Sequence, residues 1–328
     1  MLRPYDIILT KENFLFVVKN HEEFDRLIIA SPKYAPYGLA KTKFMGKTWQ
    51  MLGEEWSRIN NPLDPTSNVS EGILFYLKDY EQTKEGFRIG RGDIKKTFSA
   101  KDGITRLICR HPESQNKIRN SAKRLVNFLG RAVSPDNLGL TGSSLFGGEI
   151  EDFSDIDLVV YGSDSYKLMS EFLKGSSLPG VRFRTINEWE EFYGKYNVLT
   201  SIGKKQFAEQ MVQKYGQFLI DGIPVSVFAV RNNNDMKMQL LHKNAKINFR
   251  VYAKLEATVT DDSESMFLPS FYEISNCGKY YVYNENRAFI FQAQKDYRVF
   301  VRGELGDDLE GNKWIRVNVK NGGYLVKK

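Results

Sequence analysis

The stretch that decides the fold is Leu138-Gly-Leu-Thr-Gly142-Ser143-Ser144, followed after ten intervening residues by Asp155-Ile156-Asp157-Leu158-Val-Val-Tyr161. Its first part predicts a short buried strand over 138–141 that ends in a turn at Gly142. Its second part predicts a strand over 155–161. Successive strand residues point to opposite faces, so Asp155 and Asp157 share one face while Ile156 and Leu158 point into the core. Two carboxylates side by side on a rigid strand are a predicted site for a hard cation.

The turn between the strands has the residues of an anion cradle. Gly142 lets the backbone approach a phosphate closely, and Ser143 adds a hydroxyl at what we expect to be the first turn of a helix or a loop over 143–146. Such a cradle beside a carboxylate pair is the arrangement required for in-line nucleotidyl transfer. We therefore predict that Gly142, Ser143 and Ser144 bind the phosphates of an NTP. Asp155 and Asp157 are predicted to be catalytic and to hold Mg²⁺ or Mn²⁺.

This combination resembles the nucleotidyltransferase superfamily of DNA polymerase β, whose pattern is Gly-Ser followed at a distance by Asp-apolar-Asp on a strand. The likeness covers residues 113–230. It implies a mixed sheet with helices and the transfer of NMP from an NTP to an acceptor hydroxyl. The whole chain is also similar to a set of archaeal predicted nucleotidyltransferases that place the motif between two β-rich flanks, and the segments 5–18 and 257–269 carry this wider likeness.

The rest of the chain predicts an α+β protein of three domains: a β-rich basic domain over 1–110, the nucleotidyltransferase domain over 111–243, and a β-rich small barrel or sandwich over 244–328. Short apolar runs separated by turn residues predict strands in the first domain, and Asn60–Asn68 reads as a loop. The expected strands of the first and last domains are 5–9, 14–18, 26–30, 280–283, 288–292, 298–302 and 314–319.

In the central domain, strands and helices alternate. A helix is expected from Pro112, because Ile118, Ala122, Leu125, Val126 and Leu129 recur at helical spacing. Asp221-Gly222 predicts a tight hairpin between 217–220 and 223–230. The other expected elements are helices over 164–174, from Asn187, and over 201–215 with Ser201 as N-cap, and a strand over 181–184.

The superfamily supplies a third acidic residue from a neighbouring strand, and the corresponding position here is Ser226. A serine hydroxyl can bind magnesium but brings no charge, so it would hold a second metal weakly and be a poor base. Three interpretations follow: another acid substitutes, the enzyme is slow, or the protein binds nucleotide or nucleic acid without chemistry. The acids that we consider as substitutes are Glu149, Asp152, Glu209 and Asp221.

Charge is unevenly distributed along the chain. Lys and Arg number 47 against 40 Asp and Glu, a net charge of +7. Residues 1–130 hold 22 basic and 15 acidic side chains, residues 131–244 hold 12 and 14, and residues 245–328 hold 13 and 11. The motif thus lies in the acidic part, and the basic flanks favour RNA or DNA as a partner. An RNA or DNA end is the first choice of acceptor, ahead of a protein side chain or a small molecule.

Other function classes find little support in the sequence. Two cysteines exclude a disulfide framework, and three scattered histidines argue against a zinc site or a Ser-His-Asp triad. With no long apolar run, we expect a soluble, cytoplasmic protein without a membrane partner; its oligomeric state is left open. Aromatic residues of the last domain, Tyr280, Tyr281, Tyr283 and Phe289, could stack on bases, but their alternation favours core positions.

Overall fold

The computed structural model describes residues 1–40, 46–59, 71–83, 85–109, 116–195 and 201–328. It combines helices with three β-sheets, which confirms the predicted α+β class. The chain divides into two compact units. The first unit is Met1–Val159 with Ile223–Ser226, and the second is Val160–Gly222 with Val227–Lys328. The three-domain division stays a prediction.

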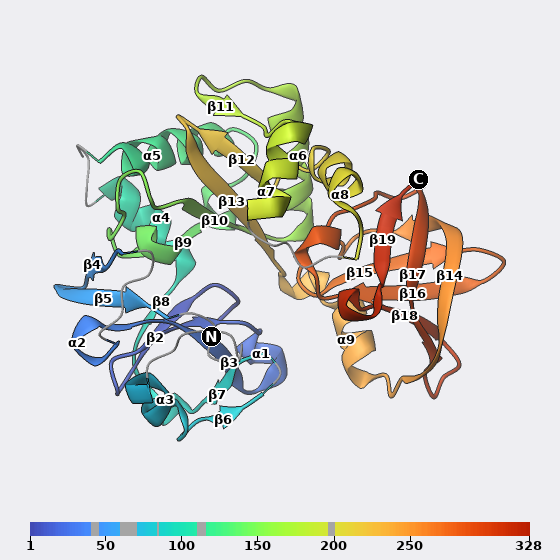
Figure 1. Ribbon diagram of the computed structural model, residues 1–328, viewed down its shortest axis with the longest axis horizontal. Helices are drawn as coiled ribbons and strands as arrows, with labels where there is room; N and C mark the ends of the chain where they lie inside the picture. Colours follow the sequence, from blue (N-terminus) through green and yellow to red (C-terminus); the bar gives the residue numbers. More distant parts are fainter. Residues whose placement is uncertain (41–45, 60–70, 84, 110–115, 196–200) are drawn as a thin grey trace. The chain divides into compact units, whose positions relative to one another are not determined.

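The N-terminal sheet, blue to cyan in Figure 1, belongs to the first unit. Its strand order is β4-β5-β3-β2-β1-β8, with β7 beside β3 and β6 beside β7. Alternate residues face two different clusters: Ile8 and Phe16 lie in one, Ile7 and Leu15 in the other. The strands are β1 Ile7–Thr10, β2 Leu15–Val18, β3 Ile28–Pro36, β4 Trp49–Met51, β5 Glu54–Arg58, β6 Glu81–Gln82, β7 Phe87–Ile89 and β8 Ile94–Phe98.

Strand β3 contains a β-bulge at Lys33. Leu15 of β2 pairs with Tyr34, whereas the next residue of β2, Phe16, pairs with Pro32. Lys33 is therefore the extra residue, and such a residue bends the strand and can re-aim a side chain. Pro32 suits the irregular place, since it has no N–H to donate to a ladder.

The described residues of the N-terminal part, where the sequence predicted mainly strands, include four helices: α1 Glu22–Asp25, α2 Tyr37–Ala40, α3 Glu71–Leu77 and α4 Ala100–Cys109. The longest, α4, is held at its start by Asp6, whose carboxylate accepts a hydrogen bond of 2.9 Å from the Ala100 N–H. It packs closely on β9 (Leu138–Thr141), because a Cβ at Gly103 would lie 2.3 Å from the Leu140 carbonyl oxygen. The predicted loop over 60–68 lies outside the described residues.

The middle of the chain forms a five-stranded sheet of order β11-β12-β13-β10-β9. Strands β9 and β10 (Ile156–Tyr161) are the two strands that the motif predicted. The hairpin of β12 (Gln217–Ile220) and β13 (Ile223–Val230) is confirmed: Asp221 and Gly222 have φ of 52° and 82°, the left-handed pair that a tight hairpin turn requires. Strand β11 (Val181–Arg182) is shorter than expected. The polymerase β-like identity of this sheet stays a prediction.

The helices of the middle region mostly agree with the sequence. In α5 (Lys117–Leu129) the predicted apolar face is buried, and Asn116 caps the helix by accepting a 3.0 Å hydrogen bond from the Arg119 N–H. Pro112, the predicted start, lies outside the described residues. Helices α6 (Ser163–Gly175) and α7 (Ile186–Lys195) fall where they were expected.

The predicted N-cap at Ser201 is wrong. Helix α8 is Lys204–Met211, with Gly203 at its N-cap. The Ser201 hydroxyl instead donates to the carbonyl of Gly323, so it does not cap the helix.

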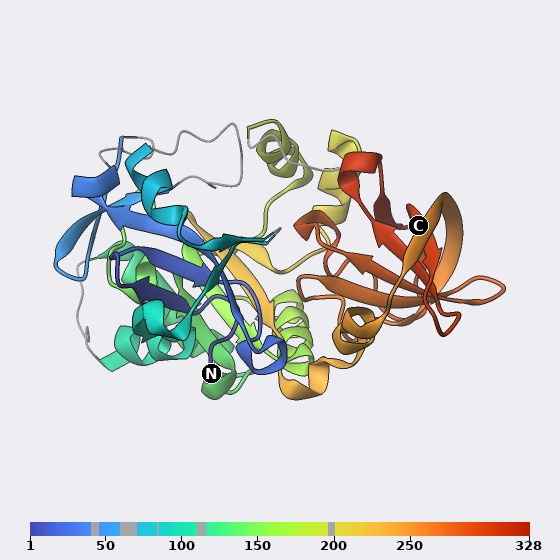
Figure 2. The same cartoon turned by 90° about the horizontal axis from the view of Figure 1, so that it is seen from below.

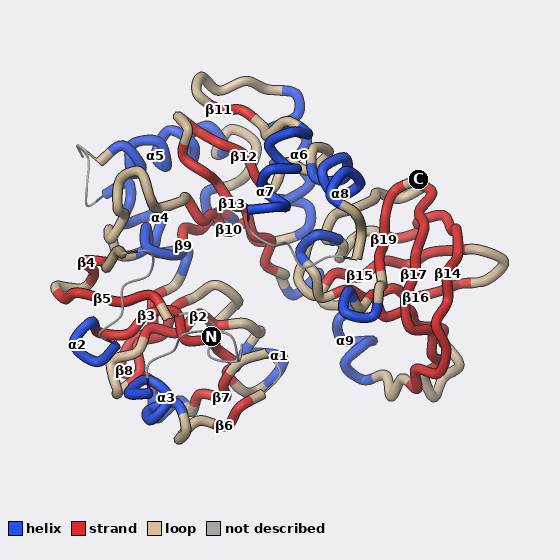
Figure 3. The backbone as a smooth tube through the Cα atoms, in the orientation of Figure 1, coloured by secondary structure: helices blue, strands red, loops and turns tan. Residues whose placement is uncertain are grey.

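The C-terminal strands form a closed barrel (Figures 2 and 3). The order β14-β15-β16-β18-β17 returns to β14, and β19 is added beside β17. Among the strand pairs described for this sheet, only β16–β18 is parallel. The strands are β14 Asn248–Asp261, β15 Ser270–Ser275, β16 Lys279–Asn284, β17 Arg298–Asp307, β18 Lys313–Val317 and β19 Tyr324–Lys327.

The predicted strand over 288–292 is wrong. Residues Arg287–Phe289 form a 3-10 turn, because the Asn286 side chain accepts a 2.8 Å hydrogen bond from the Ala288 N–H and caps it. The apolar side chains of Ala288 and Phe289 are buried all the same.

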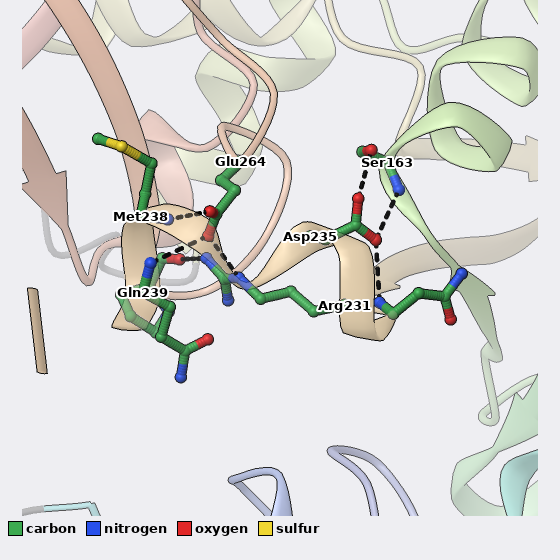
Figure 4. A network of polar contacts seen from close by, with 8 residues as sticks. Ser163, Arg231, Asp235, Met238, Gln239 and Glu264 are labelled. Atoms are coloured by element: carbon green, nitrogen blue, oxygen red, sulfur yellow. Dashed lines mark hydrogen bonds and ion pairs between the residues drawn. The ribbon is translucent and has the colours of Figure 1, made fainter. Parts of the chain in front are cut away.

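A buried polar network joins the barrel to the helices that precede it (Figure 4). The Arg231 guanidinium lies 2.9 Å from the Glu264 carboxylate, and both side chains are almost fully buried. Glu264 also accepts hydrogen bonds from the N–H groups of Met238 and Gln239, at the start of α9 (Lys237–Asn244). Nearby, Asp235 accepts from the backbone and hydroxyl of Ser163, at the start of α6. Each acid thus caps a helix.

Candidate functional site

The two halves of the motif meet at Gly142 and Asp157. A Cβ at position 142 would lie 2.6 Å from Asp157 Oδ2, and Gly142 has φ of 70°. Both the close approach and the left-handed backbone require glycine here. The expected cradle and the expected carboxylate strand are therefore adjacent in space.

The turn after β9 is a short 3-10 helix, Gly142–Leu145, in which Ser143 and Ser144 are buried. In the described part of the chain, the Ser144 hydroxyl has no hydrogen-bond partner. Buried polar atoms normally have one, so an orphaned hydroxyl calls for an explanation such as a ligand. A phosphate oxygen could accept a hydrogen bond from this hydroxyl.

The two aspartates differ in exposure. Asp155 is exposed and Asp157 half-buried, while Ile156 and Leu158 are fully buried, as the alternation predicted. The loop before them is closed by Ser154, whose hydroxyl accepts a hydrogen bond of 2.9 Å from the Ile150 N–H. This closure fixes where Asp155 enters the strand.

The N-terminal sheet supports this loop. Phe146 stacks edge-on against Phe98 at a centroid distance of 4.9 Å, and Phe153 lies 5.8 Å from Trp49. A Cβ at Gly148 would lie 2.4 Å from Met51, so the loop backbone packs directly on strand β4. The N-terminal sheet and this loop belong to the same compact unit.

A lysine that the sequence analysis did not single out lies at the site. Lys33 Nζ is 3.8 Å from Asp157 Oδ2, and the two side chains are 24% and 15% exposed. In the sequence, Pro32 and Lys33 follow directly after the strand expected over 26–30. Pro32 is a local sign of an irregular strand, but it does not show that Lys33 reaches Asp157, which is distant in the chain.

Charges of both signs act on the hydroxyl of the next residue, Tyr34. Burial raises the pKa of its hydroxyl; Lys33 and Arg58 oppose the rise, and Asp157 and Asp155 add to it. Tyr34 pairs with Arg58 across β3 and β5. Two cations of the N-terminal sheet and two carboxylates of the motif thus act on one phenol.

Within the part of the chain that the structure describes, no third carboxylate joins Asp155 and Asp157. Among the described residues, no three His, Cys, Asp or Glu side chains lie together in a way that could hold a metal. Glu149 is buried in an ion pair of 3.0 Å with Arg119, and Asp152 is exposed in the loop. Glu209 and Asp221 belong to the second unit. Ser226 is half-buried on β13, the strand that neighbours β10.

The residues present fit a single hard cation. Magnesium in proteins prefers one or two carboxylates together with substrate phosphates, and Asp155 and Asp157 supply the carboxylates. The Ser144 hydroxyl, which has no partner in the described part of the chain, is a group that could bind a phosphate oxygen. Two carboxylates alone do not enclose a metal ion, so an ion held here would need further oxygen ligands.

A comparison of the chain with models of protein families and with curated proteins found no match. Within the described residues, no helix is both long and apolar enough to cross a membrane.

Proposed function

We propose that this chain is a magnesium- or manganese-dependent nucleotidyltransferase. An acceptor hydroxyl attacks the α-phosphorus of an NTP, a new O–P bond forms, the α–β phosphate bond breaks and pyrophosphate leaves. The hydroxyl proton passes to a carboxylate or to water. The observation that carries the proposal is the contact of Gly142 with Asp157, because it joins a phosphate cradle to a carboxylate strand.

Each residue has a distinct role in this proposal. Asp155 and Asp157 would hold the metal ion, which neutralises charge on the phosphates. The backbone of Gly142 and the hydroxyls of Ser143 and Ser144 would bind the outer phosphates. The N-terminal sheet holds the loop between these groups through aromatic contacts, so the two halves stay aligned.

The test is the transfer of label from each of four α-labelled NTPs, with magnesium or manganese, to total cellular RNA, protein and small-molecule fractions. We expect wild type to label one fraction and the Asp155→Asn/Asp157→Asn double variant to label none. Asp136→Asn is the matched control, because it makes the same change at an exposed position of the 3-10 turn Pro135–Asn137. Activity that survives in the double variant would exclude this site.

For the acceptor we favour an RNA or DNA end. The C-terminal barrel has the closed five-stranded order of OB-type barrels, an architecture that binds oligonucleotides. On it, Tyr252 is 41% exposed and the Arg302 guanidinium lies 5.5 Å from its ring, which is a pair on which a base can stack. This acceptor class requires that the protein bind single-stranded RNA or DNA with an affinity that falls as salt rises.

A second candidate function is nucleotide binding without transfer, and Ser226 is the observation that favours it. Metal-dependent NTP binding with no turnover in any fraction would support it. The variant Ser226→Asp separates the two functions, because it restores a carboxylate on the strand beside β10. An active enzyme with a weak second metal site should become faster, and a pure binding protein should stay inactive.

A further inference from the structure

The residue that the proposed reaction leaves unexplained is Lys33. It reaches the motif from another part of the chain, 124 residues before Asp157, and it does so from a bulge in β3. In a regular strand, Lys33 would occupy a ladder position between its neighbours. The bulge removes it from pairing with β2, and its side chain reaches Asp157.

The contact has the features of a replaceable ion pair. At 3.8 Å it is longer than a close hydrogen-bonded pair, and both side chains keep some exposure to solvent. A cation at this distance neutralises one of the two carboxylates expected to hold the metal. Lysine is suited to exchange, because its ammonium is a compact charge on a flexible stem that can move between partners.

We propose that Lys33 is an exchangeable counterion of the site. It balances the charge of Asp157 while the metal is absent, and it moves to a phosphate oxygen of the nucleotide once the metal takes the carboxylate. This inference rests on the proposed function. It makes the N-terminal sheet a contributor of a phosphate-binding group, in addition to its supporting role.

The exchange has two consequences of opposite sign. Removing the Lys33 charge should strengthen binding of the metal alone, because the ion no longer competes with an ammonium. The same change should weaken binding of a polyphosphate, because one positive group is lost. A lysine that serves only packing or solubility would give neither pattern.

The experiment uses the full chain and two probes, Mn²⁺ alone and inorganic tripolyphosphate with saturating Mn²⁺, with binding measured by calorimetry. We expect Lys33→Met to bind Mn²⁺ on the order of tenfold more tightly, and to bind tripolyphosphate on the order of tenfold more weakly, than wild type. Lys33→Arg keeps the charge and should remain close to wild type on both probes. Lys95→Met is the matched control, since Lys95 lies in the same sheet, exposed, with its Nζ 3.1 Å from Asn13 Oδ1.

The outcomes separate this inference from the proposed function. If wild type binds both probes through Asp155 and Asp157 but Lys33→Met matches the Lys95→Met control, the exchange is wrong and the site stands. The exchange is also wrong if Lys33→Met weakens Mn²⁺ binding. If the Asp155→Asn/Asp157→Asn variant binds Mn²⁺ and tripolyphosphate as wild type does, the proposed site itself fails, and the exchange fails with it.

Discussion

The two compact units each contain an ion pair in a sheet-rich region, and the pairs differ in almost every respect. Arg231 and Glu264 of the second unit lie 2.9 Å apart, 3% and 2% exposed. Lys33 and Asp157 of the first unit lie 3.8 Å apart and remain partly exposed. The first of these pairs is also saturated: Glu264 accepts from two backbone N–H groups, and Arg231 donates to the Pro269 carbonyl.

The difference shows how to distinguish a structural charge from a functional one. A buried charge pair is tolerated only when further hydrogen bonds satisfy its atoms. Removing either partner then strongly lowers the free energy of unfolding. Lys33 and Asp157 remain partly exposed, at 24% and 15%, and the backbone of Gly142 approaches the Asp157 carboxylate closely. Such a pair contributes little to folding and is available for a ligand.

The largest effect should come from breaking the buried pair. Arg231→Met leaves the Glu264 carboxylate buried without its counterion, and we expect a loss of about 3–5 kcal/mol in the free energy of unfolding. Arg231 is also enclosed by Phe267 and Phe271, with its guanidinium 4.5 and 5.4 Å from their rings. Urea unfolding followed by tryptophan fluorescence measures the change.

The double variant Arg231→Met/Glu264→Gln is the control for this loss. It should recover part of the stability, because no buried charge is left uncompensated and the amide oxygen can still accept from the N–H groups of Met238 and Gln239. If the single variant unfolds at the wild-type urea concentration, the pair is not structural and the contrast with Lys33–Asp157 disappears.

The next effect is on catalysis. Gly142→Ala forces a methyl group toward Asp157 Oδ2 and strains a backbone with positive φ, so the carboxylate or the cradle must move. A displacement of about 1 Å at a catalytic group commonly costs on the order of a hundredfold in rate, and we expect at least that loss of transfer. Gly92→Ala is the control, because a Cβ there meets nothing within 4 Å. Equal activity in the two variants would contradict the contact.

These two sites also show what the sequence can and cannot predict. Strands β9 and β10, the tight turn at Asp221-Gly222 and the buried face of α5 follow from local periodicity, since the alternation of apolar residues records which side is buried. For the same reason Asp155 and Asp157 were recognisable as a pair on one face. The local pattern of residues was enough to predict an element wherever its conformation depends on one continuous segment.

The rest depends on partners that are distant in the chain. The bulge that brings Lys33 to Asp157 arises from the register between β2 and β3, and Glu264 caps α9 from a loop that follows β14. Closure of the barrel needs β14 to pair with β17, beyond two intervening strands. The mistaken cap at Ser201 has the same origin, because its hydroxyl is taken by Gly323.

A third effect is a pH dependence in the second unit. His242 of α9 lies among aromatic rings, 4.1 Å from Tyr283 and 5.3 Å from Trp314 between centroids. Burial, with a smaller contribution from Arg316, lowers the pKa of His242 to about 4. In the unfolded chain the histidine pKa is about 6.5, so the unfolded chain binds the proton more tightly than the folded protein does. The free energy of unfolding must therefore fall as pH drops from about 6.5 to about 4.

Because the ring is only partly buried, we expect this loss to be about 1–3 kcal/mol. His242→Gln removes the titration, so the difference between wild type and variant in urea midpoint should shrink or reverse between neutral pH and about pH 4. A constant difference across that range would mean that the histidine is protonated as easily in the folded protein as in the unfolded chain.

The smallest effect concerns α5, the helix beside the loop that precedes Asp155. Asn116 caps α5, and α5 carries Arg119, which holds Glu149 and donates to the Gly147 carbonyl at 3.2 Å. Asn116→Ala should cost about 1 kcal/mol of stability through the lost cap. Because Arg119 fixes the loop that leads to Asp155, transfer should also fall, but by much less than in Gly142→Ala. Asn116→Asp keeps a capping acceptor and should leave both quantities near wild type.

If Asn116→Ala lowered transfer as strongly as Gly142→Ala, the position of the loop would depend on α5 more than on the N-terminal sheet. The aromatic contacts of Phe146 and Phe153 would then be secondary to the Arg119–Glu149 pair.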